Sequence, residues 1–185
     1  MKIGFVIYDG MTALDFVGVF DPLSRLKIMG FLKNVSWDIC APTEQVTDGA
    51  GLVFRPTQVG IPLNRYDLVV VPGGLVTRRL RYEGSFIDWL KTMEPCSFKT
   101  SVCSGALLLG AAGFLKGKKA TTHPSARVEL AEYCTQVVDQ RIVDEGSVIT
   151  SGGVTSAIDL GLYLCEKFAG FDVKEKIRVQ MDYYG

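Results

Sequence analysis

Short hydrophobic runs recur along the chain and alternate with segments of helical periodicity. Nearly continuous apolar runs are typical of parallel strands buried on both faces. They predict strands at residues 2–8 (KIGFVIY), 35–40, 66–71 (YDLVVV), 98–102, 119–122 and 148–150. Helical periodicity or turn residues predict helices at residues 16–20, 85–93, 126–133, 155–168 and 173–183. Strands that alternate with helices predict an α/β fold, with a mainly parallel sheet between two helical layers.

Turn residues set several boundaries. Asp21–Pro22 resembles an N-cap followed by a first-turn proline, which predicts that a helix starts or restarts there and runs to about Ile28. Ser125 is placed to cap the helix at 126–133. Asp48–Gly49 within residues 46–54 predicts a hairpin or a short excursion of the chain. Two further short strands are expected at 137–138 and 141–143, the second joined to 148–150 by a turn.

Residues 98–113 (FKTSVCSGALLLGAAG) combine a strand, a sharp turn and a buried helix. Cys103 lies at the turn, an arrangement that resembles a nucleophile elbow. A thiol at a helix N-terminus faces unpaired amides, so we expect the thiolate to be favoured. Gly105 and Gly113 are expected to let the helix approach the strand. The alternative is that Cys103 is a buried, inert cysteine.

Composition narrows the range of functions. The 185 residues fit a single domain, and 20 basic against 20 acidic residues with no basic block give no nucleic-acid surface. No apolar run approaches a membrane span and no signal peptide is apparent, so we expect a cytoplasmic protein without membrane contact. Five cysteines without CxxC spacing and a single histidine favour neither a disulfide framework nor a zinc site. We expect no metal and no cofactor.

Small or reactive residues follow five predicted strands. They are Asp15, Gly73–Gly74, Cys103, His123 and Gly152–Gly153. Because ligands of parallel α/β sheets bind beyond the carboxyl ends of the strands, we expect these residues to meet at one rim.

Three motifs resemble the ThiJ/PfpI superfamily, which has the class I glutamine amidotransferase-like (flavodoxin-like) fold. They are VVVPGG at 69–74, TSVCSGALLLGAAGFLKGKKATTH at 100–123 and VITSGGVTSAIDLGL at 148–162. Within that superfamily, the segment after Cys103 and the Leu14–Asp15 pair are most similar to isocyanide (isonitrile) hydratases.

The resemblance implies a mechanism and roles for particular residues. Cys103 would attack the terminal carbon of an isocyanide, and Asp15 would act as general acid and base. Backbone amides around Gly73, Gly74 and Ser104 would line an anion-stabilising pocket. Asp15 beside a thiolate would resist ionisation, so the pair should titrate as a unit. The superfamily also implies a homodimer acting on a small molecule.

Plainer roles stay open for several of these residues. Asp15 could simply cap a helix, Gly73–Gly74 could be turn glycines, and His123 could be structural. Gly153 is expected to give room to a ligand or to backbone. The chain also departs from the family pattern: Ser104 replaces the histidine of the peptidases, and LDFVGV stands where the hydratases have LDLTGP.

Other functions fit the same cysteine. A redox-responsive stress protein would oxidise Cys103 to a sulfinate held by Asp15. An amidase or a glyoxalase-like enzyme would use Cys103 on a carbonyl. A ligand sensor is a further alternative, although the chain has no DNA-binding module.

Overall fold

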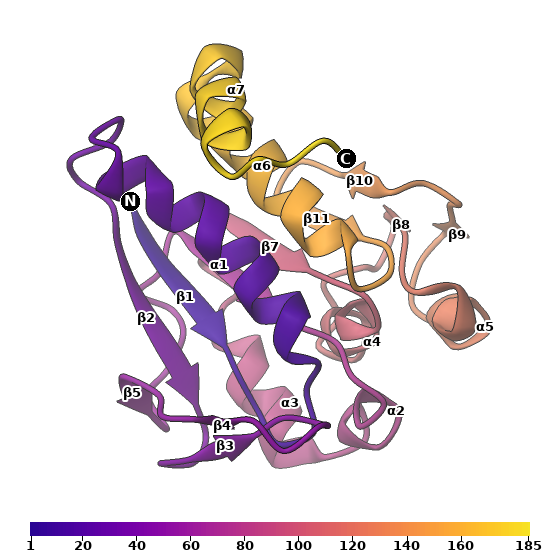
Figure 1. Ribbon diagram of the computed structural model, residues 1–185. Helices are drawn as coiled ribbons and strands as arrows, with labels where there is room; N and C mark the ends of the chain where they lie inside the picture. Colours follow the sequence, from indigo (N-terminus) through magenta and orange to yellow (C-terminus); the bar gives the residue numbers. More distant parts are fainter.

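The computed structural model describes residues 1–185, and its centre is a seven-stranded sheet in the order β10-β11-β7-β6-β1-β2-β5 (Figure 1). All neighbouring strands are parallel except β10, which pairs antiparallel with β11. The strands are β1 (Lys2–Val6), β2 (Ser36–Ala41), β5 (Gln58–Val59), β6 (Leu68–Val71), β7 (Phe98–Ser101), β10 (Ile142–Asp144) and β11 (Val148–Ser151). This architecture confirms the predicted α/β fold.

Helices cover both faces of the sheet. On one face, α1 (Ala13–Ile28) packs against α6 (Ser156–Ala169), which in turn packs against α7 (Phe171–Gln180) (Figure 1). On the other face, α4 (Gly105–Ala111) contacts α2 (Thr77–Leu80), α3 (Gly84–Lys91) and α5 (Arg127–Leu130). The buried hydrophobic side chains form one cluster of 45 residues, so both layers share a single core. None of the helices is long and apolar enough to cross a membrane.

Two small sheets lie outside the central one. The predicted hairpin is confirmed as β3 (Val46–Thr47) paired antiparallel with β4 (Val53–Phe54). The predicted strand at 119–122 is shortened to β8 (Lys119–Ala120), which pairs with β9 (Gln136–Val137) and not with the central sheet. His123 therefore approaches the rim from a separate two-stranded sheet.

The predicted restart of a helix at Asp21–Pro22 is wrong, because α1 continues through Pro22. Proline in a helix interior removes one backbone donor and crowds the carbonyl four residues earlier. That carbonyl belongs to Gly18, and both it and the Pro22 ring lie against Gly161 of α6. Close packing against a glycine lets α1 accommodate its proline.

The predicted Ser125 cap is also wrong. A 3₁₀ turn, η1 (Pro124–Ala126), precedes α5, and Ser125 lies inside that turn. The cap is His123, whose Nδ1 accepts the amide N–H of Ser125 at 3.2 Å. A histidine is an uncommon capping residue, so the sequence pattern favoured the serine.

Candidate active site

Cys103 lies between β7 and α4 with a backbone φ of 55°. A non-glycine residue in this left-handed region is strained and needs support from its surroundings. The Cys103 amide donates to the carbonyls of Ser151 (3.2 Å) and Gly152 (2.8 Å), and its carbonyl accepts the Thr122 hydroxyl at 2.7 Å. The predicted strand–turn–helix geometry around Cys103 is thus present, and neighbouring segments hold it on both sides.

Asp15 is a fully buried carboxyl in the first turn of α1. Its Oδ2 accepts the amide N–H of Gly73 at 2.8 Å, across the site and not within its own helix. Its other oxygen, Oδ1, is buried without a hydrogen-bond partner. The helix-cap alternative is therefore wrong, and one carboxyl oxygen of Asp15 stays buried and unpartnered, although Asp15 does not line the cavity above Cys103.

Gly73 brings the acid and the thiol together. A β-carbon on Gly73 would lie 2.9 Å from Asp15 Oδ2, 2.9 Å from Cys103 Cβ and 2.7 Å from the Ser104 nitrogen. Only a residue without a side chain fits among these three atoms. Gly105 lets α4 approach a strand closely, as predicted, because a β-carbon there would lie 2.5 Å from the Val71 carbonyl. The same prediction for Gly113 is wrong, because no atom lies within 4 Å of a β-carbon there. Gly113 follows the end of α4 with a backbone φ of 90°.

Burial controls the titration of both groups. It raises the pKa of Asp15 to about 7 from an ordinary 3.8, while the Gly73 amide and the Cys103 thiol act in the lowering direction. Burial also raises the pKa of Cys103 to about 11 from 9.0, and the Asp15 charge adds to that rise. The expected preference for the thiolate is therefore wrong for the resting protein. The Ser104 amide lowers the Cys103 pKa, but this effect is smaller than that of desolvation.

The predicted anion pocket at Gly73–Gly74 is already occupied by protein acceptors. Gly73 donates its amide to Asp15, and Gly74 donates its amide to Ser104 Oγ at 3.0 Å. The Ser104 hydroxyl donates in return to the Gly74 carbonyl at 3.0 Å. In this arrangement these two glycines position the acid and Ser104. The amide and the hydroxyl of Ser104 both lower the pKa of the Cys103 sulfur.

A cavity of about 170 Å³ opens above Cys103, whose side chain is otherwise almost entirely buried. It brings together three of the predicted residues other than Cys103, namely Gly74, Ser104 and His123. Residues that sequence reasoning missed complete the lining: Thr12, Leu75, Arg78, Ser125 and Val154.

Arg78 joins two walls of this cavity. Its Nε donates to Glu129 at 2.9 Å, and its Nη2 donates to the Ser125 carbonyl at 2.7 Å. Arg78 therefore ties α2 to the turn after His123. The sequence carried no signal for this role, because Arg78 is one of several arginines in a short polar stretch.

His123 lines the cavity in a local hydrogen-bonding arrangement. Its Nδ1 lies 2.8 Å from the Ser125 hydroxyl and also accepts the Ser125 amide. Gly153 makes room for this ring, because a β-carbon there would lie 3.0 Å from His123 Cδ2. These contacts agree with the structural alternative for His123. Nowhere in the chain do three or more His, Cys, Asp or Glu side chains gather in a way that could hold a metal ion.

Tyr8 is a further group that sequence reasoning missed. It follows β1, is almost fully buried and donates its hydroxyl to the Pro72 carbonyl at 2.5 Å. Burial raises its pKa well above the usual range, and the charges of Asp15 and Cys103 add to that rise. A neutral phenol therefore lies close enough to the acid and the thiol for their charges to act on it.

Comparison with known proteins shows the family of this chain. The family model described as the DJ-1/PfpI family matches residues 1–167. The chain belongs to the DJ-1/PfpI family. A ThiJ/PfpI family protein from Pseudomonas syringae superposes with a TM-score of 0.88 at 31% identity, over 100% of this chain and 75% of that one.

Two named members of the DJ-1/PfpI family are similar in sequence. The isonitrile hydratase of Pseudomonas putida is 32% identical over 184 residues, which are 99% of this chain and 78% of that protein. The glutathione-independent glyoxalase DJ-1 of Schizosaccharomyces pombe is 32% identical over 111 residues, 58% of each protein. The family therefore includes proteins named as enzymes, while homodimerisation of this chain stays a prediction.

Proposed function

We propose that this protein is a cysteine-dependent hydratase of a small electrophile, converting an isocyanide to an N-substituted formamide. The observation that carries this proposal is the buried Cys103–Asp15 pair, with one carboxyl oxygen free and a pKa close to neutrality. Similarity to the isonitrile hydratase over nearly the whole chain supports the choice of substrate class.

The first half of the reaction adds the thiol across the isocyanide carbon. As the sulfur attacks that carbon, ionised Asp15 takes the thiol proton and then delivers it to the same carbon. A C–S bond and a C–H bond form, the S–H bond breaks, and the product is a thioimidate, R–N=CH–S–Cys103. Nothing leaves at this stage.

The second half releases the product by hydrolysis. Asp15 takes a proton from water as the water oxygen attacks the thioimidate carbon. The C–S bond then breaks, the nitrogen gains one proton and the sulfur gains the other, so that the Cys103 thiol is restored. The balance is one isocyanide and one water consumed for each formamide formed, with the thiol restored.

The pKa values suit this exchange. An acid–base group works best when its pKa is near the working pH, and that of Asp15 is about 7. Because the Cys103 pKa is about 11, the resting nucleophile is a thiol that needs a neighbouring base. In this proposal Asp15 serves as that base.

Turnover of an aryl isocyanide, followed as formamide formation, tests the proposal. The Cys103→Ala variant should lose all measurable activity, and Asp15→Asn should lose at least ~100-fold because its general acid–base role is gone. Cys134→Ala, a half-buried cysteine outside the cavity, and Asp172→Asn, an exposed first-turn acid of α7, serve as matched controls. Both controls should retain wild-type rates.

The absence of turnover with a confirmed reduced thiol would contradict the hydratase proposal. Oxidation chemistry is disfavoured by the raised Cys103 pKa, because thiolates are the oxidised species. Peroxide-dependent mass gain confined to Cys103, without turnover of isocyanides, would support the redox alternative. Turnover of 2-oxoaldehydes or amides alone would support a glyoxalase-like or amidase function.

A further inference from the structure

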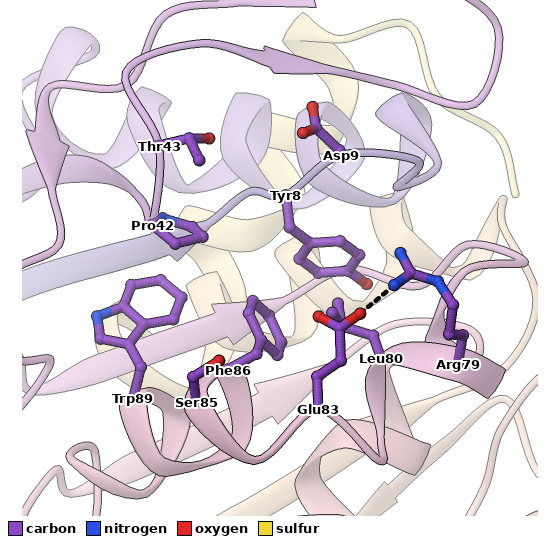
Figure 2. A pocket seen from close by; sticks show the side chains of 10 residues that line it. All are labelled: Tyr8, Asp9, Pro42, Thr43, Arg79, Leu80, Glu83, Ser85, Phe86 and Trp89. Atoms are coloured by element: carbon purple, nitrogen blue, oxygen red, sulfur yellow. Dashed lines mark hydrogen bonds and ion pairs between the residues drawn. The ribbon is translucent and has the colours of Figure 1, made fainter.

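A second cavity, of about 290 Å³, lies beyond the carboxyl ends of β1 and β2 (Figure 2). Its walls come from the residues after β1, the residues after β2, and the segment from the end of α2 through α3. It shares no lining residue with the cavity above Cys103. Ligands of parallel α/β sheets bind at this end of the strands, so the place suits a binding site.

Aromatic rings form one side of this cavity. Tyr8 and Phe86 meet edge to face with centroids 5.4 Å apart, and Phe86 lies 5.7 Å from the Trp89 ring. The polar atoms of two of these rings are engaged elsewhere: Tyr8 donates to Pro72, and Trp89 Nε1 donates to the Ile61 carbonyl at 2.7 Å. Tyr8 and Phe86 are almost fully buried, so the half-buried Trp89 ring offers most of the apolar and π-electron surface to a ligand.

The charged groups of the cavity are two carboxylates and one guanidinium. Glu83 accepts a hydrogen bond from Arg79, as the dashed line in Figure 2 shows. Asp9 lines the same cavity and uses one oxygen, Oδ1, to accept the Thr47 amide at 2.8 Å. Asp9 is exposed, so its other oxygen faces solvent at the edge of the cavity. Because Arg79 is paired with Glu83, the lining as a whole carries one net negative charge.

We propose that this cavity binds a small organic ammonium ion with an apolar tail. Aromatic faces attract cations through their quadrupoles, and the excess carboxylate adds to that attraction. The tail would lie against Phe86, Trp89 and Pro42, and the ammonium group would lie near the carboxylates. An anionic ligand would have to displace Glu83 from Arg79 and would face Asp9.

The chain has two tryptophans, so a Trp37→Phe protein would leave Trp89 as the sole fluorescent reporter in the cavity wall. The probe is 2-phenylethylammonium, with 2-phenylethanol and 3-phenylpropionate as neutral and anionic analogues. We expect a saturable fluorescence change with 2-phenylethylammonium at lower concentration than with either analogue. This readout does not depend on turnover or on Cys103.

Charge variants locate the interaction. In the Trp37→Phe background, Asp9→Asn keeps an acceptor for the Thr47 amide and should weaken the binding of 2-phenylethylammonium by about three- to tenfold. Asp88→Asn removes the same charge from an exposed position of α3 outside the cavity and should not change binding. No saturable change, equal binding of 2-phenylethanol, or tighter binding of 3-phenylpropionate would overturn the proposal. Unchanged affinity in Asp9→Asn would overturn it as well.

Discussion

Asp15 and Cys103 show how burial decides the chemistry of single residues. Each group loses hydration, so each favours its neutral form, and the pKa of both is raised. The helix N-terminus beneath Cys103 acts in the opposite direction but has the smaller effect. At the residue scale the site is therefore a neutral thiol beside a carboxyl poised near pH 7.

Removing the Asp15 charge should make Cys103 easier to ionise. In Asp15→Asn we expect the rate of iodoacetamide alkylation at Cys103 at pH 8 to rise about threefold or more, because the carboxylate that raises the thiol pKa is gone. Mass spectrometry of the Cys103 peptide over a pH series measures this, with Cys134 in the same samples as internal reference. An equal or slower rate would contradict the claim that the Asp15 charge raises the pKa of the Cys103 thiol.

The raised Asp15 pKa also predicts a pH-dependent cost to stability. Unfolded Asp15 loses its proton near pH 3.8, whereas folded Asp15 holds its proton until about pH 7. Between these two pH values the unfolded state loses the Asp15 proton while the folded state keeps it. The contribution of Asp15 to the free energy of unfolding therefore falls as the pH rises, and the full loss is present above pH 7. Asp15→Asn should therefore be more stable than wild type by ~2–4 kcal/mol at pH 8.

Urea unfolding of both proteins at pH 4.5 and pH 8 measures this difference in free energy of unfolding. The gain of Asp15→Asn should shrink strongly at pH 4.5. A variant that is less stable than wild type at pH 8 would contradict the account of Asp15 as a costly buried acid.

At the scale of elements, the packing of α1 on α6 places the acid. Gly18 lies one turn beyond Asp15, and a β-carbon there would come within 2.6 Å of Ala157 Cβ. Pro22 and Gly161 continue the same close contact. Small residues on both helices thus set the distance of α1 from α6 and hold Asp15 at the rim.

Gly18→Ala should push α1 away from α6. We expect a loss of about 1–3 kcal/mol in the free energy of unfolding, the usual cost of overpacking a close contact, and a fall in turnover because Asp15 moves with α1. Val17→Ala, at a partly exposed position of the same helix, is the control and should change neither quantity much. Equal effects in the two variants would show that the contact does not position the acid.

At the scale of the whole molecule, the hydrophobic runs predicted the central strands and the order of the layers. They missed β5 and α2, because two or four residues with few apolar positions carry no periodic signal. The sequence predicted that Cys103 and Asp15 lie at one rim of the sheet, because each residue follows a predicted strand. Arg78 and Tyr8 were missed because their roles arise from contacts with segments distant in the sequence.

The covalent step is the central claim, and the intact mass of wild-type protein quenched in acid during turnover of an aryl isocyanide tests it most directly. Because the thiol adds across the isocyanide carbon without a leaving group, we predict a mass gain equal to the whole substrate, located at Cys103 and absent in Cys103→Ala. Turnover without any adduct at Cys103, or an adduct of equal yield in Cys103→Ala, would contradict the account.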